Sequence, residues 1–123
     1  RNTNMLMWHK ELWLIDHGAA FYFHHSWSNR EKHAKSPFTL IKDHVLLPQA
    51  TLLEEANAQC SAVLTHRFIR DIVELIPQEW LQWQDTQDSP QEIKQAYFEF
   101  LTTRLAHSEI FIKEAQNARQ TLI

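Results

Sequence analysis

Two polar side chains near the start of the chain, Asn4 and Asp16, have the types and the spacing that best suit chemistry. Two short apolar runs and a charged turn separate them, and Gly18, the only glycine in the sequence, follows. A carboxylate and an amide oxygen that lie close together can share a hard divalent cation such as Mg²⁺. Phosphoryl transfer often needs such a cation, because Mg²⁺ neutralises charge on nucleotide phosphates. The pair therefore indicates part of a metal and nucleotide site.

The element that would bring these two side chains together is a β-hairpin over residues 4–16. Its apolar runs are short and bounded by a turn, which is typical of strands. A three-residue loop at 9–11 would place Asn4 opposite Asp16, with Cβ atoms roughly 4.5–5.5 Å apart. A two-residue loop would break this pairing, and the three-residue register is our prediction. Both faces of each run are apolar, so we expect the hairpin to be covered on both sides.

The same two residues also have a simpler interpretation. Asn and Asp are common turn formers at strand ends, because their side chains bond nearby backbone groups. The aliphatic-Asp-x-Gly pattern is short and occurs often by chance. Spacing alone leaves both interpretations open.

The wider sequence of this segment carries a family resemblance. Residues 2–27 read Asn-x-Asn-Met-Leu-x-Trp, a turn, and then Leu-Trp-Leu-Ile-Asp-His-Gly-Ala-Ala-Phe-Tyr-Phe-His-His-x-Trp. This run resembles the HipA-like kinase family, a distant branch of the protein-kinase and phosphoinositide-kinase superfamily. Residues 37–48 and the segments behind them resemble the family more diffusely.

The resemblance implies specific roles for the residues named above. In such kinases an asparagine and the aspartate of an Asp-x-Gly motif hold Mg²⁺ on the phosphates of ATP. Asp16 would be the metal-binding aspartate and Asn4 its asparagine partner, with Asn2 as the alternative ligand. The hairpin geometry favours Asn4, because Asn2 would project beyond the open end.

Parts of the family pattern are missing from the chain. The catalytic aspartate is expected upstream of Arg1, as are the nucleotide-covering loop and the phosphate-contacting lysine. We therefore expect a C-terminal fragment of an ATP- and Mg²⁺-dependent phosphotransferase that is inactive by itself and whose phosphoacceptor is unknown. The alternative is a non-catalytic helical interaction module derived from a kinase fold. An apolar face left by the missing part would promote self-association.

The composition excludes several other classes of protein. The chain has 123 residues, 44% of them hydrophobic and 22% charged, with a net charge of −3. This mild acidity argues against a nucleic-acid-binding face, which would show a basic stripe. No apolar run approaches the roughly 20 residues that cross a bilayer, so no membrane partner is expected. The single cysteine, Cys60, fits a reducing cytoplasm, and its small apolar neighbours predict that it is buried.

The overall pattern predicts an α+β fold that is mostly α. An N-terminal β-hairpin would precede a bundle of three to four helices, as in the C-terminal lobe of a kinase-like fold. Residues 1–27 would form the metal-binding hairpin and an aromatic connector (residues 19–27), and residues 28–123 the helical part of the same lobe. Within that part, residues 28–37 are polar and are expected to form an exposed loop.

Residue spacing also predicts where helices begin and which faces they bury. Thr51 with Glu54, and Ser89 with Glu92, have the spacing of a capping box. Trp80 is expected to dock into the core. Stripes at helical spacing are expected to be buried; they comprise Leu64, Phe68, Ile72, Leu75 and Ile76, then Ile93, Ala96, Tyr97, Phe100 and Leu101, and finally Phe111, Ala115, Ala118 and Leu122.

Overall fold

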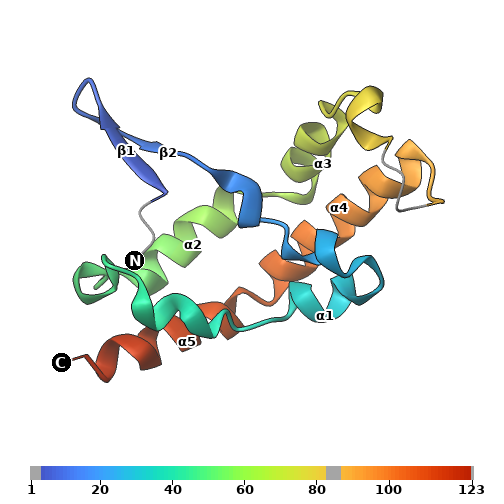
Figure 1. Ribbon diagram of the computed structural model, residues 1–123. Coiled ribbons are helices and arrows are strands. Elements are labelled where there is room, and N and C mark those ends of the chain that lie inside the picture. Colours follow the sequence, from blue (N-terminus) through green and yellow to red (C-terminus); the bar gives the residue numbers. More distant parts are fainter. Residues whose placement is uncertain (1–3, 83–86, 123) are drawn as a thin grey trace.

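The computed structural model describes residues 4–82 and 87–122 of the chain. In these ranges one two-stranded antiparallel sheet precedes a set of helices, which confirms the predicted α+β, mostly α class (Figure 1). The strands are β1 (Met5–Trp8) and β2 (Glu11–Leu14). The α-helices are α1 (Arg30–Ala34), α2 (Leu53–Val63), α3 (His66–Glu74), α4 (Pro90–Ala106) and α5 (Ser108–Gln120).

Short 3₁₀ helices join these elements. They span His17–Ala19, Tyr22–His25, Trp27–Asn29, Thr39–Asp43, Leu47–Gln49 and Gln78–Leu81. The segment 28–37, predicted to be an exposed loop, contains α1 and buries Ala34 to 2% exposure, so that prediction was wrong. The reason is packing: α1 lies against α4, and the one small apolar residue of the segment faces that helix.

The core is built around α4. This helix packs against α1 and α3, and its predicted face is confirmed, with Ile93, Ala96, Tyr97 and Phe100 buried. The aromatic connector supplies Phe23, which is fully buried and lies 4.4 Å from Phe100 between ring centroids. The other members of the core cluster are Ala34, Ile69, Val73 and Leu81.

Of the two predicted capping boxes, only the one before α4 forms. The Ser89 N–H donates to the Glu92 carboxylate at 2.7 Å, and the Glu92 N–H donates to Ser89 Oγ at 3.3 Å. Thr51 was the wrong cap for α2, which begins at Leu53 after Leu52. The Thr51 N–H instead donates to the Gln49 carbonyl at 2.9 Å, so Thr51 takes part in a γ-turn that follows the preceding 3₁₀ helix.

The buried face of α3 differs from the predicted stripe by one position. Ile69 and Val73 pack on α4, whereas Phe68, Ile72 and Leu75 of the stripe are 43–80% exposed. Both faces of this helix carry apolar residues at helical spacing, so periodicity could not choose between them.

Four further burial predictions were wrong, one of them at Leu122, which is 52% exposed at the C-terminal end of its predicted stripe. Trp80 is 75% exposed, because the short helix at 78–81 buries Leu81 instead. Cys60 is exposed, since α2 has no buried residue. The hairpin was expected to be covered on both faces, yet every residue of β2 is exposed. Trp80 and β2 therefore leave large apolar side chains in contact with solvent.

Two cations of α4 close the ends of neighbouring helices. Arg104 Nη1 donates to the carbonyls of Ala34 and Ser36 at 3.2 and 3.1 Å, at the C-terminal end of α1. Lys94 Nζ donates to the Glu74 carbonyl at 2.9 Å and to its carboxylate at 3.1 Å, at the end of α3. Helix C-termini carry partial negative charge and unsatisfied carbonyls, so a cation there is stabilising.

Replacing Arg104 with methionine should destabilise the fold. Arg104→Met keeps apolar contact area but leaves the α1 carbonyls without their donor, and hydrogen bonds from charged groups contribute about 1.5–3 kcal/mol each. We expect the free energy of unfolding, measured in urea, to fall by about 2 kcal/mol. Arg67→Met is the matched control, because Arg67 is 92% exposed and its ion pair is long at 3.9 Å. Equal losses in both variants would contradict this role for Arg104.

The capping box predicts a pH dependence. The hydrogen bonds from Ser89 lower the pKa of Glu92 below its usual 4.5. This contribution to stability is therefore complete above the usual pKa and is lost as pH falls through the lowered one. Glu92→Gln keeps an acceptor without titrating, so the urea midpoint should fall less between about pH 7 and about pH 3 than in the parent chain. Glu79→Gln serves as the control, because Glu79 lies in the short helix at 78–81, outside the capping box, and its urea midpoint should fall as far as that of the parent. An unchanged fall in Glu92→Gln would refute the prediction.

Candidate metal site at the hairpin mouth

The hairpin turn has two residues rather than the predicted three. Trp8 pairs with Glu11 and Leu6 with Trp13, so the loop consists of His9 and Lys10. Both loop residues have positive φ, at 50° and 68°, which is the backbone of a type I′ turn. Such turns match the right-handed twist of the strands, and this match prevails although neither residue is glycine or asparagine. The three-residue register was therefore wrong.

Asn4 and Asp16 nevertheless meet at the open end of the hairpin, which we call the hairpin mouth. The Ile15 N–H donates to the Asn4 carbonyl at 2.9 Å, so Asn4 stands opposite Ile15. Asn4 Nδ2 then donates to the main-chain carbonyl of Asp16 at 2.8 Å. A side-chain hydrogen bond, rather than direct opposition across the strands, joins the two predicted ligands.

The backbone of Asp16 turns the chain out of the hairpin. Its φ and ψ of 52° and 66° are left-handed, a conformation that Asp adopts more readily than most residues. The turn leads directly into the 3₁₀ helix at 17–19. Asp16 Oδ1 lies 3.7 Å from the place that a Cβ would occupy on Gly18, and both residues are exposed. The carboxylate thus lies beside the glycine of the motif, accessible to solvent.

The mouth offers two kinds of oxygen to a cation. The Nδ2 hydrogen bond uses the donor end of the Asn4 amide and leaves its Oδ1 as an acceptor, and Asp16 adds a carboxylate. Mg²⁺ is commonly bound by one or two protein oxygens together with water and substrate phosphates. Among the described residues, no three or more His, Cys, Asp or Glu side chains gather into a metal-binding group. Asn2, the alternative ligand, lies outside the described residues.

The aromatic connector anchors the mouth to the helices. His24 Nε2 and Tyr97 Oη lie 2.8 Å apart, and Trp27 Nε1 donates to the Asp88 carboxylate. Burial raises the pKa of the Tyr97 hydroxyl, which therefore stays protonated at neutral pH. With Phe23 buried beneath them, these contacts fix the segment that follows Gly18. Sequence spacing did not predict the His24 and Tyr97 contact, because 73 residues separate the two.

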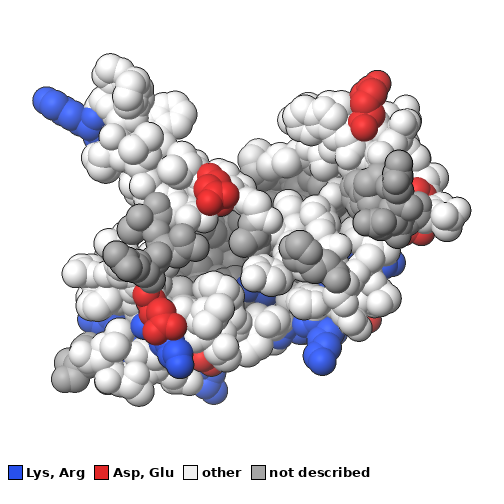
Figure 2. Space-filling view, viewed as in Figure 1, with Lys and Arg blue, Asp and Glu red and all other residues white. Residues whose placement is uncertain are grey.

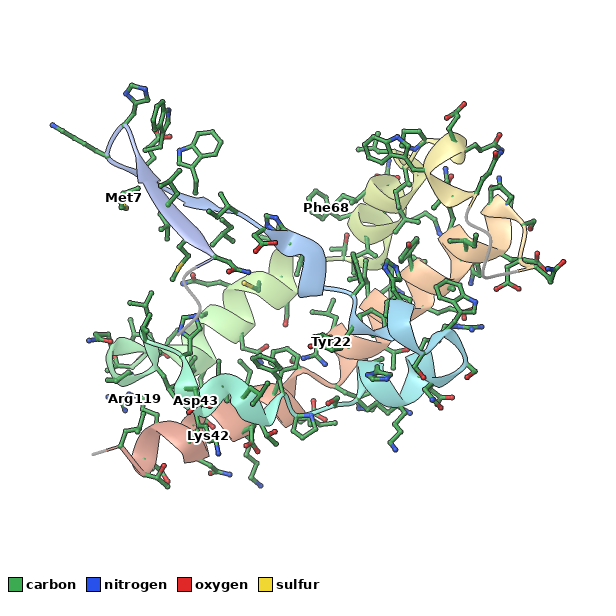
Figure 3. The ribbon with its side chains drawn as sticks, viewed as in Figure 1. Met7, Tyr22, Lys42, Asp43, Phe68 and Arg119 are labelled. Atoms are coloured by element: carbon green, nitrogen blue, oxygen red, sulfur yellow. The ribbon has the colours of Figure 1, made fainter. Side chains whose placement is uncertain are left out.

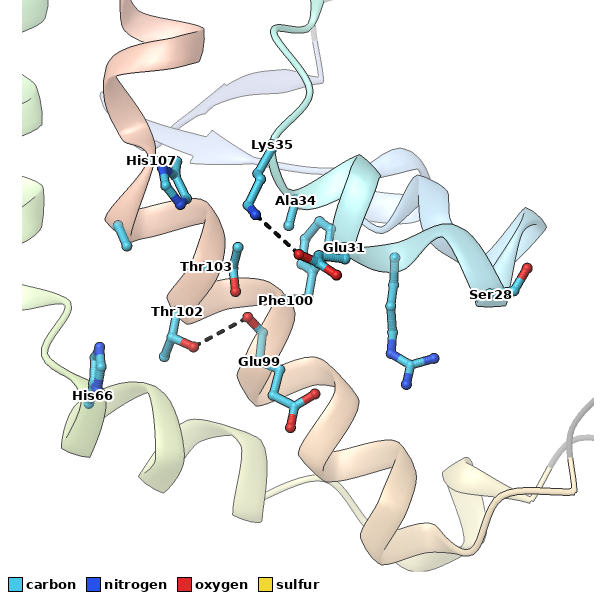
Figure 4. A pocket seen from close by; sticks show the side chains of 12 residues that line it. Ser28, Glu31, Ala34, Lys35, His66, Glu99, Phe100, Thr102, Thr103 and His107 are labelled. Carbon is cyan, nitrogen blue, oxygen red and sulfur yellow. Dashed lines mark hydrogen bonds and ion pairs between the residues drawn. The ribbon is translucent and has the colours of Figure 1, made fainter.

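A groove of about 630 Å³ lies between α1 and α4 (Figure 4), and another of about 640 Å³ lies between α2 and α5. The walls of the groove between α1 and α4 include Arg30, Glu31, Lys35, Glu99 and His107, which tertiary structure alone brings together. Lys35 Nζ forms an ion pair with Glu31 at 3.1 Å within the groove. The charges of Lys35 and Glu31 therefore compensate each other within the wall of the groove. No residue of the hairpin mouth lines this groove.

Comparison of the chain with protein-family models, with curated proteins and with solved structures found no match. The resemblance to HipA-like kinases, and the roles it implies for Asn4 and Asp16, therefore stay predictions. None of the helices in the described ranges has both the length and the apolar character that crossing a bilayer requires.

Adding a methyl group at Gly18 should be tolerated. The φ of Gly18 is not positive, and a Cβ there would meet Asp16 Oδ1 at an ordinary contact distance of 3.7 Å. Gly18→Ala should leave the free energy of unfolding unchanged or raise it by up to about 1 kcal/mol, since alanine restricts the unfolded chain. Asp16→Ala is the contrasting variant and should lose about 1 kcal/mol, because alanine is strained in the left-handed region. Thermal and urea unfolding measure both, and a larger loss in Gly18→Ala would contradict the expectation.

Proposed function

We propose that this chain supplies the metal-binding half of the nucleotide site of a HipA-like, ATP- and Mg²⁺-dependent phosphotransferase. One observation carries the proposal. At the hairpin mouth, Asn4 Nδ2 donates to the main-chain carbonyl of Asp16 at 2.8 Å, which brings the two residues together. The sequence resemblance implies Asp16 and either Asn4 or Asn2 as the ligands. The proximity of Asn4 and Asp16 supports the proposal because it persists although the register that first suggested it was wrong.

In this proposal each residue of the mouth has a distinct role. The Asp16 carboxylate and Asn4 Oδ1 would hold Mg²⁺, which would supply positive charge to neutralise the phosphates of ATP. Asn4 Nδ2 orients the amide by holding the Asp16 carbonyl. Gly18 places no side chain beside the carboxylate, where a Cβ would lie 3.7 Å from Asp16 Oδ1. The catalytic aspartate that accepts the proton of the phosphoacceptor belongs to the family pattern before Asn2, so transfer requires a segment that these 123 residues do not contain.

Mn²⁺ serves as a paramagnetic probe of the proposed Mg²⁺ site in the 123-residue chain. We expect Mn²⁺ to broaden amide NMR signals selectively at Asn4 and at residues 16–18, and excess Mg²⁺ to restore them. Asp16→Asn removes the charge but suits the left-handed backbone, and it should weaken Mn²⁺ binding by at least about tenfold. Asp71→Asn is the matched control, because Asp71 is an exposed aspartate on α3 and should not affect binding.

Two results would overturn the metal assignment. One is broadening that is absent from the hairpin mouth, and the other is an Asp16→Asn variant that binds Mn²⁺ like the parent. ATP should tighten Mn²⁺ binding in the parent chain, because its phosphates complete the coordination of the ion. In a protein that also contains the upstream aspartate, Asp16→Asn should abolish ATP-dependent phosphate transfer while the helical circular dichroism stays unchanged.

The alternative function, a non-catalytic interaction module, is favoured by a different observation. Large apolar side chains on the hairpin and on α3 are exposed, and such patches mark interaction sites. This alternative predicts no cation binding at the mouth, so the Mn²⁺ experiment separates it from the phosphotransferase proposal.

A further inference from the structure

The β-hairpin exposes apolar side chains on both of its faces. Figure 1 shows the hairpin standing away from the helices, and Figure 3 shows its side chains directed outward on either side. The apolar side chains that are 41–66% exposed are Leu6, Met7, Trp8, Leu12, Trp13, Leu14 and Ile15. A two-stranded hairpin alone is marginally stable in water, and a solvated sheet face would carry polar residues. The exposed apolar side chains of this hairpin therefore indicate that another polypeptide segment packs against it.

The outer edges of the hairpin carry main-chain groups that suit further strand pairing. The Ile15 to Asn4 hydrogen bond and the register make Leu6–Trp13 a hydrogen-bonded pair of the ladder. The N–H and C=O groups of the alternate residues, including Leu12 and Leu14 on β2, consequently point away from the partner strand. Neither strand contains a proline, and charge occurs only at Glu11, so the usual protections of an edge strand are missing.

A second apolar surface faces the same side of the molecule. Phe68 and Ile72 of α3, and Leu75 directly after it, are exposed, and Figure 3 shows Phe68 directed from α3 toward the hairpin side. The space-filling view is hollowed between the hairpin and α3, and few charged side chains border the hollow in this view (Figure 2). We call the seven hairpin side chains named above, together with Phe68, Ile72 and Leu75, the apolar arm surface.

The apolar arm surface is large enough to supply a dimer interface. Its ten side chains, which are 41–80% exposed, offer on the order of 1,000 Å², of which strand pairing would cover the part beside β2. A stable interface buries about 800 Å² on each partner. The surface also contains two of the five tryptophans of the chain, Trp8 and Trp13, and tryptophan is enriched among the residues that dominate binding energy.

We propose that the hairpin is a dimerisation arm and that its partner is the hairpin of a second copy of this chain. A two-fold axis at Trp13 would pair the two β2 strands antiparallel, with Leu12 of each copy opposite Leu14 of the other. This register uses the outward-pointing main-chain groups of β2 and forms a four-stranded sheet. The β2 edge is preferred because both of its outward-pairing residues are well exposed, Leu12 to 59% and Leu14 to 66%. On β1, Met7 is 65% exposed but Met5 is partly covered.

A second copy of the chain accounts for the exposed β2 edge and apolar side chains, because a two-fold interface places the same surface of each copy against the other and stops at two subunits. Each β2 edge is satisfied by its equivalent, and both Trp13 rings come to one face at the axis, where cross-strand aromatic pairs are stabilising. The inference uses strand edges and apolar faces, whereas the proposed function uses polar side chains at the mouth. The dimer can therefore fail without affecting the metal site, and the metal site can fail without affecting the dimer.

Sedimentation velocity of the 123-residue chain over a range of concentrations tests the dimer. We expect the parent chain to sediment with the mass of a dimer at tens of micromolar. The double variant Leu12→Lys/Leu14→Lys should weaken association by more than about tenfold, because it places charges at the centre of the interface. Leu40→Lys is the matched control, since Leu40 is 62% exposed in a 3₁₀ helix outside the apolar arm surface, and it should associate like the parent.

A cross-linking experiment tests the register without relying on the charged variants. Residues 13 of the two copies would form a non-hydrogen-bonded pair with Cα atoms about 4.5 Å apart, which is within the range for a disulfide. In a Cys60→Ser background, Trp13→Cys should form a disulfide-linked dimer under mild oxidation faster than Leu40→Cys. A monomeric parent chain, an unaffected double variant, or equal cross-linking of the two cysteine variants would each overturn the proposal. So would association seen only with lipid vesicles.

Discussion

Helix α4 organises the molecule because its two cationic side chains close the C-terminal ends of the helices that pack on it. Lys94 is 8% exposed and binds the last turn of α3, and Arg104 binds the carbonyls that follow α1. A buried cation is costly unless it is hydrogen-bonded, so each of these contacts strongly restricts where the neighbouring helix can end. Burial lowers the pKa of Arg104, and the Phe111 ring lies 4.6 Å from its guanidinium carbon. The apolar face of α4 then fixes the position of the aromatic connector.

This arrangement leaves the chain with two regions of different packing. Around α4, the buried Phe23, Ile93 and Val73 belong to one continuous cluster. The hairpin and α2 contribute no fully buried side chain among the described residues. The hairpin mouth is positioned at the boundary between these regions, because the segment that follows it carries Phe23 into the core. Asp16 at the mouth is exposed to solvent.

Local signals predicted those features that depend on a few neighbouring residues. The Ser89 capping box and the buried face of α4 follow from short-range hydrogen bonding and from a helical period with one apolar face. The proximity of Asn4 and Asp16 was also predicted, although by the wrong register. The type I′ turn at His9 and Lys10 was missed, because neither residue type indicates a left-handed backbone as glycine would.

The sequence by itself determined the fold class, the existence of the hairpin and the start of α4, because each depends on contacts within a few residues. Only the tertiary structure decided which face of α3 is buried, that α2 and Cys60 are exposed, and that His24 meets Tyr97. These outcomes depend on which segments of the chain pack against α4 and which are left exposed to solvent. Contacts that decide this competition join residues up to 79 positions apart, such as Phe21 and Phe100, so no local pattern encodes it.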